Sequence, residues 1–233
     1  MDLKNHVKVI FDTGFNIALR SKLISVPGIG GYMDVVYTES MQAMKQRAFK
    51  NSLEELDEKK IDKEYLNSLE FLNLLVLTYK MALDEIELDK IIFFSKLIKN
   101  SLESSEEERK YNFDYIKIVH ELSIDQMHLL HEIYIQQKDL YKFREESPEY
   151  NELNLVHECT DWKNLPKILN DKYGIDENDL NFLLKRTEST GLIREITGSY
   201  IGYDGGTYIM NETLRKFMDR LDIVVSEKDN LIE

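Results

Sequence analysis

The stretch NLPKILNDKYGIDENDLNFLLKRTESTGLIREI, residues 164–196, carries the clearest structural pattern in the chain. Apolar residues recur at helical spacing in both halves: Leu165, Ile168 and Leu169 in the first, and Leu180, Leu183 and Leu184 in the second. Gly174 provides a C-terminus for the first helix, Asp176 can cap the second, and Gly191 ends it. The pattern predicts a helix-turn-helix.

Strand-like runs follow this pair of helices at residues 192–196, 200–203 and 207–210. Turn sequences, Thr197-Gly198 and Asp204-Gly205-Gly206, separate them. A last helix begins near Asn211, with apolar residues at Leu214, Phe217, Met218 and Leu221. Helices followed by a small sheet predict a winged helix-turn-helix domain over residues 160–222 and leave residues 223–233 as a C-terminal tail.

The preceding part of the chain reads as helical, so the expected fold class is mainly α. Amphipathic helices are expected over residues 3–22 and 32–56, on either side of a Gly- and Pro-rich break. Gly14 weakens the first of them and permits a close contact. Residues 65–83 are apolar on every side of a helix, which predicts the centre of a bundle.

The later part of this region shows one clear helix start. Ser123 and Gln126 form a capping box for a long helix. The polar, acid-rich segment 101–110 is expected to be an exposed loop. We therefore predict a helical bundle over residues 1–146 and a linker over residues 147–159.

Composition places the chain among cytoplasmic globular proteins. Its 233 residues include a single cysteine, Cys159, which excludes an intrachain disulfide framework and fits a reducing compartment. Charged residues interrupt the N-terminal segment, so it does not resemble a signal peptide. No apolar run is long enough to predict a transmembrane segment.

The net charge of −13 is unevenly distributed. Residues 53–159 carry 13 Lys/Arg against 25 Asp/Glu, a net charge of −12 that opposes nonspecific nucleic-acid binding. Residues 3–50 are basic and amphipathic, which permits peripheral contact with a membrane or an acidic partner. Their excess of positive charge is small, so packing beside the acidic middle is the preferred interpretation.

Histidines suggest a second hypothesis, a metal site. His120, His128 and His131 fall within twelve residues, and Glu132 lies four residues after His128. One helix face can present two imidazoles and a carboxylate to a metal ion, with His120 completing the site. The spacing differs from that of zinc proteases, and histidines also serve as half-buried helix residues. We therefore predict no metal, no cofactor and no catalytic residue.

The predicted second helix of the winged domain is poorly suited to DNA. In a helix-turn-helix reader its first turn approaches the base edges, but here that turn is Asp176-Glu177-Asn178-Asp179. A nucleic-acid interface would depend on the later polar and basic residues Asn178, Asn181, Lys185, Arg186 and Arg194. Protein docking is therefore preferred to DNA reading.

Segments such as LDKIIFFSKLIKNSL (88–102), HELSIDQMHLLHEIY (120–134) and RTESTGLIREI (186–196) resemble a loose group of small bacterial and prophage-encoded helical proteins with a C-terminal winged helix, similar to the abortive-infection alpha type. The resemblance implies a bacterial or phage protein connected with phage–host conflict. We expect a non-enzymatic module that binds another protein or itself. The alternatives are a winged-helix transcriptional regulator and a metal-dependent enzyme using the histidine cluster.

Overall fold

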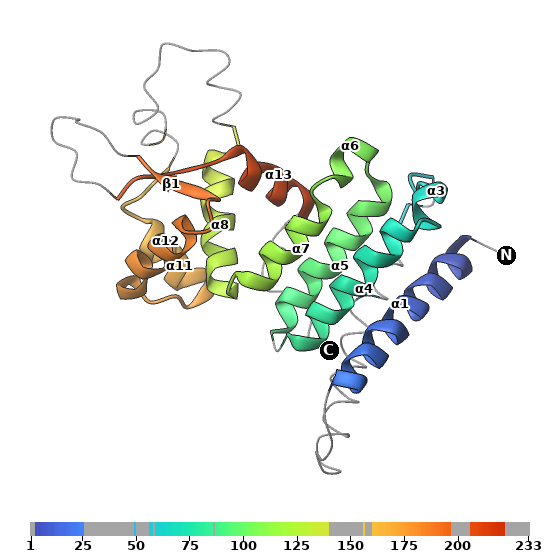
Figure 1. Ribbon diagram of the computed structural model, residues 1–233. Helices are drawn as coiled ribbons and strands as arrows, with labels where there is room; N and C mark the ends of the chain where they lie inside the picture. Colours follow the sequence, from blue (N-terminus) through green and yellow to red (C-terminus); the bar gives the residue numbers. More distant parts are fainter. Residues whose placement is uncertain are drawn as a thin grey trace. The chain divides into compact units, whose positions relative to one another are not determined.

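The computed structural model describes residues 3–25, 49, 56–57, 59–85, 87–139, 156, 160–196 and 206–221. In these ranges the chain is mainly helical with one two-stranded sheet (Figure 1), as expected for the fold class. The chain divides into two compact units, Met1–Glu121 and Leu122–Glu233. None of the described helices combines the length and apolar character needed to cross a bilayer.

The first unit is built around one apolar helix. Its described helices are α1 (Leu3–Ser25), α3 (Lys63–Leu66), α4 (Leu69–Asp84), α5 (Leu88–Glu103), α6 (Glu106–Arg109) and α7 (Asn112–Glu121). Helix α4 packs against α1, α3, α5 and α7. Phe71, Leu74 and Leu75 on α4 are fully buried. The prediction that the 65–83 segment forms the centre of a bundle is confirmed.

Helices α1 and α4 approach closely at Gly14, and they lie side by side in Figure 1. A Cβ atom at Gly14 would lie 2.7 Å from Cδ2 of Leu75, so a larger side chain would have to displace that leucine. Aromatic pairs flank the contact: the ring centroids of Phe11 and Phe71 are 6.0 Å apart. The close contact predicted at Gly14 is confirmed.

Residues 101–110 do not form the predicted exposed loop. Helix α5 continues to Glu103, and α6 follows after a short turn. Arg109 is only 7% exposed; its guanidinium lies 2.9 Å from an Asp62 carboxylate oxygen and 3.9 Å from the centroid of the Tyr65 ring. Arg109 also donates hydrogen bonds to the backbone carbonyls of Ser101 and Ser104. The acid-rich composition of the segment gave no sign of this buried arginine, because Asp62 and Tyr65 lie more than forty positions earlier.

The second unit has another central helix. Its elements are α8 (Ile124–Gln137), α11 (Leu165–Tyr173), η1 (Glu177–Asp179), α12 (Leu180–Glu188), β1 (Ile193–Glu195), β2 (Tyr208–Met210) and α13 (Glu212–Leu221). Helix α8 packs against α11, α12, α13 and β2. The strands are antiparallel, with Ile193 opposite Met210.

The units divide at a different place from the predicted boundary between residues 146 and 147. That boundary assigned residues 124–137 to the N-terminal bundle. The buried residues of α8 instead have their partners in α11, α12, α13 and β2, so this helix forms the core of the second unit. The 3.6-residue period identifies a buried face but does not identify which elements cover it.

Local sequence signals for helix ends are present in the structure. The Ser123–Gln126 capping box forms at the start of α8. Gly174 ends α11 with φ of 73°, and the Asp176 side chain accepts a hydrogen bond from the Asn178 backbone N–H. Several predictions lie outside the described residues: the strand at 200–203, the tail at 223–233, residues 147–155 and 157–159 of the linker, and residues 26–48.

Candidate functional site

A buried carboxylate lies between α8 and α11 in the second unit. Glu132 is only 3% exposed, and its Oε1 accepts hydrogen bonds from Lys172 Nζ at 2.9 Å and from the Tyr173 hydroxyl at 2.8 Å. Burial by itself raises the pKa of Glu132, but the interactions with His131, Lys172 and Tyr173 outweigh it and hold the pKa at about 2. The carboxylate is therefore ionised at neutral pH and joins the two helices.

The histidines considered as candidate metal ligands surround this carboxylate only in part. The His128 ring stacks on Tyr173 with centroids 4.0 Å apart, and His131 Nδ1 lies 3.8 Å from Glu132 Oε1. His120 is on α7 in the first unit, where its backbone carbonyl accepts a hydrogen bond from Lys90. Among the described residues, no group of three or more His, Cys, Asp or Glu side chains is arranged to hold a metal ion.

The contacts of Glu132 with Lys172 and Tyr173 indicate a structural role for this carboxylate. Its Oε1 already accepts from an ammonium and a phenol, which satisfy the negative charge that a cation would otherwise neutralise. Burial and the Glu132 contact raise the pKa of the Tyr173 hydroxyl, which keeps it protonated as a donor. The geometry therefore favours a role for Glu132 in holding α8 and α11 together over a role in binding a metal ion.

The 3₁₀ helix η1, which directly precedes α12, presents carboxylates to solvent. Asp176, Glu177 and Asp179 are exposed, as is Asn178. Asp176 Oδ1 accepts hydrogen bonds from both the backbone N–H and the side-chain amide of Asn178, each at 2.8 Å. Asn178, one of the residues predicted for DNA contact, thus donates to the residue that caps η1.

Lys185 is bound to carboxylates of its own unit. Its Nζ lies 2.6 Å from Glu195 and 3.1 Å from Glu188, and it lies 5.4 Å from the centroid of the Tyr208 ring. The Glu195 contact, followed by those of Tyr208 and Glu188, raises the pKa of Lys185. Its charge is balanced locally, which reduces its attraction for a phosphate.

The remaining residues of the predicted nucleic-acid interface are on the surface. Asn181 and Arg186 are exposed on α12, and Arg194 is exposed on β1. Asn178 and Lys185, by contrast, have hydrogen bonds inside the unit. The structure places Asn181 and Arg186 on the outer side of the helix, opposite the buried residues Leu183 and Leu184.

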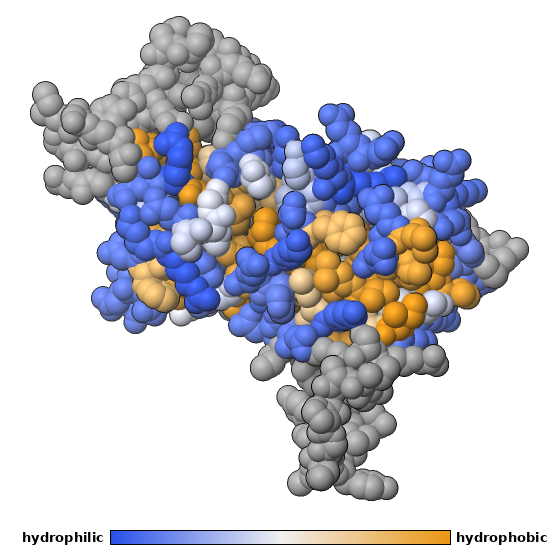
Figure 2. Space-filling view, viewed as in Figure 1, coloured by the Kyte–Doolittle hydropathy of each residue, from blue (hydrophilic) through white to orange (hydrophobic). Residues whose placement is uncertain are grey.

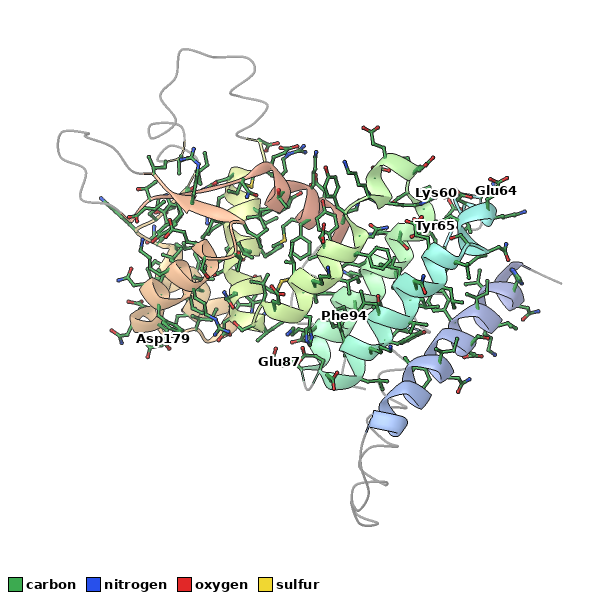
Figure 3. All side chains as sticks on the ribbon, in the orientation of Figure 1. Lys60, Glu64, Tyr65, Glu87, Phe94 and Asp179 are labelled. Atoms are coloured by element: carbon green, nitrogen blue, oxygen red, sulfur yellow. The ribbon has the colours of Figure 1, made fainter. Side chains whose placement is uncertain are left out.

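One apolar residue on that outer side was not among the predicted site residues. Phe182 is 63% exposed, and it is the only large hydrophobic residue exposed on the described part of α12. Figure 2 shows a small apolar area among hydrophilic side chains over α11 and α12, and Figure 3 labels Asp179 at the start of α12. The sequence did contain a signal for this exposure, since Phe182 lies outside the apolar helix face formed by Leu180, Leu183 and Leu184.

The outer face of α12, consisting of Asn181, Phe182, Lys185 and Arg186, is the candidate functional site. It combines one exposed aromatic ring with polar and charged neighbours. The single cysteine of the chain, Cys159, lies outside the described residues. No protein-family model matches the chain, and no curated protein or solved structure matches it.

Proposed function

We propose that residues 160–222 form a winged-helix domain. The order of elements supports this: α11 and α12 would be the helix-turn-helix pair, β1 and β2 would belong to the wing, and α13 would close the domain. In such domains the second helix commonly contacts the partner, which directs attention to the outer face of α12.

We further propose that the protein is a non-enzymatic interaction module that binds a protein through the outer face of α12. The exposure of Phe182 is the observation that supports this best. An aromatic ring supplies a large apolar contact at low entropic cost and is enriched among residues that dominate binding energy. The acidic first turn and the local neutralisation of Lys185 disfavour phosphate binding on the same face.

The biological setting is proposed from the resemblance to abortive-infection alpha proteins. It supports a cytosolic role in phage–host conflict, in which the module would recognise another component of the system. Because this resemblance rests on helix order and packing segments, it supplies no binding residues. The binding face is proposed from α12 alone.

A photo-crosslinking experiment tests the binding face. The full chain would carry p-benzoylphenylalanine at position 182, with the same probe at Val9 on α1, another exposed apolar position, as control. Irradiation is expected to yield discrete protein adducts from position 182 that are absent from the Val9 probe. Phe182→Ser should weaken capture of the same protein by roughly 10-fold or more, as expected for an aromatic anchor.

An electrophoretic mobility shift assay with DNA tests the alternative function, which is DNA binding. Tight binding at low salt that weakens steeply as salt rises, together with loss on Arg186→Ala, would replace the docking proposal with DNA binding. Absence of any adduct from position 182 would also overturn the proposal. Circular dichroism of each variant would verify that the helical content is unchanged.

A further inference from the structure

The outer face of α12 has charges of opposite sign on either side of its aromatic residue. Asp179 precedes Phe182 by three positions, and Arg186 follows it by four. Both charged side chains are exposed, and within the described residues neither has an ion-pair partner. Lys185, by contrast, is bound to Glu188 and Glu195.

Helical geometry prevents Asp179 and Arg186 from pairing within one chain. Seven residues span about 10 Å along a helix axis, beyond the reach of a direct ion pair. At about 100° per residue, Asp179 lies roughly 60° and Arg186 roughly 40° to the same side of Phe182. Each charge therefore lies on the docking face with no internal counterpart in that helix.

We propose that the partner on this face is a second copy of the chain, with the two α12 helices antiparallel and the Phe182 rings at their crossing point. This inference rests on the proposed docking function and names its partner. Antiparallel pairing about Phe182 would place Asp179 of each copy beside Arg186 of the other, so the contact is made twice by two-fold symmetry. Antiparallel helices also bring opposite ends of their dipoles together.

Charge complementarity favours a second copy of the chain over an unrelated partner whose charges are all of one sign. A uniformly acidic partner would be repelled by Asp179, and a uniformly basic partner would be repelled by Arg186. A face that is acidic at one end and basic at the other is complementary to its own reversed copy. Phe182, midway between the charges, fits the position that faces itself in such a pair.

The contact is expected to be weak. One short helix from each copy supplies less than the roughly 800 Å² per partner of a standard interface. The net charge of −13 adds repulsion between copies, although at 0.15 M salt the screening length is only about 8 Å. We expect a dissociation constant of roughly 0.1 mM, in the range of weak complexes.

Sedimentation equilibrium of the full chain tests the proposal, from about 10 µM to 1 mM protein, a range that brackets this affinity, at 0.15 M salt. Wild type is expected to show a reversible monomer–dimer equilibrium. Asp179→Arg and Arg186→Asp should each weaken it at least about 10-fold, because like charges then meet twice. An equimolar mixture of the two variants should restore dimers, since every cross-copy pair is again of opposite sign.

The double variant Asp179→Arg/Arg186→Asp should also recover the homodimer, whereas a general change in helix stability would not be corrected in this way. Glu177→Arg is the matched control: it makes the same charge change in the same turn, away from the Phe182 side, and should leave dimerisation unchanged. A mixture that stays monomeric, or loss of dimers in the control, would overturn the proposal.

The outcome is separable from that of the docking function. Wild type that remains monomeric at 1 mM, about tenfold above the expected dissociation constant, while position 182 crosslinks to a different protein, would overturn self-association and retain the docking proposal. Adducts of position 182 at twice the chain mass, lost in Arg186→Asp and regained in the mixture, would support both.

Discussion

Helices α4 and α8 are the central helices of their respective units, but they bury different kinds of side chain. Helix α4 buries Phe71, Leu74 and Leu75, and it packs against α1, α3, α5 and α7. Helix α8 also buries apolar residues, yet Gln126, His131, Glu132 and Gln137 are buried with them. The first core is maintained mainly by removal of apolar surface, and the second also depends on specific hydrogen bonds.

Gln137 shows what the polar core adds. It is fully buried; its Nε2 donates to Thr160 Oγ1 at 2.9 Å and to the Tyr208 carbonyl at 3.0 Å, while its Oε1 accepts from Met210 N–H at 2.9 Å. One side chain thus attaches α8 to the first and last residues of β2. Hydrophobic packing is non-directional, so it would not fix the position of β2 against α8 in this way.

The largest effect is expected from Phe71→Ala in α4. Removal of a fully buried ring should lower the free energy of unfolding of the first unit by about 3–5 kcal/mol, since the ring's contacts and its transfer energy are both lost. Urea denaturation with hydrogen exchange over α4 would measure this. Leu69→Ala is the control: that leucine is 77% exposed and should cost less than about 0.5 kcal/mol.

Gln137→Met should give the next largest effect, although the side-chain volume is nearly conserved. The change leaves the buried Met210 N–H and the Tyr208 carbonyl without this partner, with an expected cost of about 2–4 kcal/mol. Lys138→Met is the control, because it introduces the same residue at the neighbouring, exposed position. Hydrogen exchange should accelerate at Met210; unchanged stability would show that α8 is held by apolar packing in the manner of α4.

Glu132→Gln should have the smallest effect at neutral pH, about 1–2 kcal/mol, because the amide retains part of the contact with Lys172 and Tyr173. The pH dependence of the free energy of unfolding distinguishes this variant from the wild type. The folded pKa of about 2 is below the unfolded value near 4.3, so the carboxylate's contribution is present above about pH 5 and is lost as pH falls toward 2.

Acid titration of stability would measure this difference. The wild-type protein should lose stability more steeply than Glu132→Gln between about pH 5 and pH 2, since only the wild type takes up a proton at this site on unfolding. Phe71→Ala should retain the wild-type slope. Parallel curves for wild type and Glu132→Gln would exclude the ionised Glu132 as a contributor to the stability of α8.

Local features of the sequence predicted much of the secondary structure. The Ser123–Gln126 capping box and the left-handed Gly174 were readable because their hydrogen bonds join residues within one turn. The all-round apolar pattern of residues 65–83 similarly indicated a central helix, since such a segment must be covered on every side. For the candidate site, Arg186 was identified from its helix position and charge.

Tertiary structure alone decided the partners of the polar residues. Glu132 meets Lys172 40 positions later, Gln137 meets Met210 73 positions later, and Lys185 is neutralised by Glu195 across a turn. Neither helical periodicity nor charge counting predicts such pairs, because each requires two elements to be packed first. The same packing leaves Phe182 on the outside of α12. The sequence by itself therefore determined where the main helices form, and only their packing decided which charges are satisfied and which face is available for a partner.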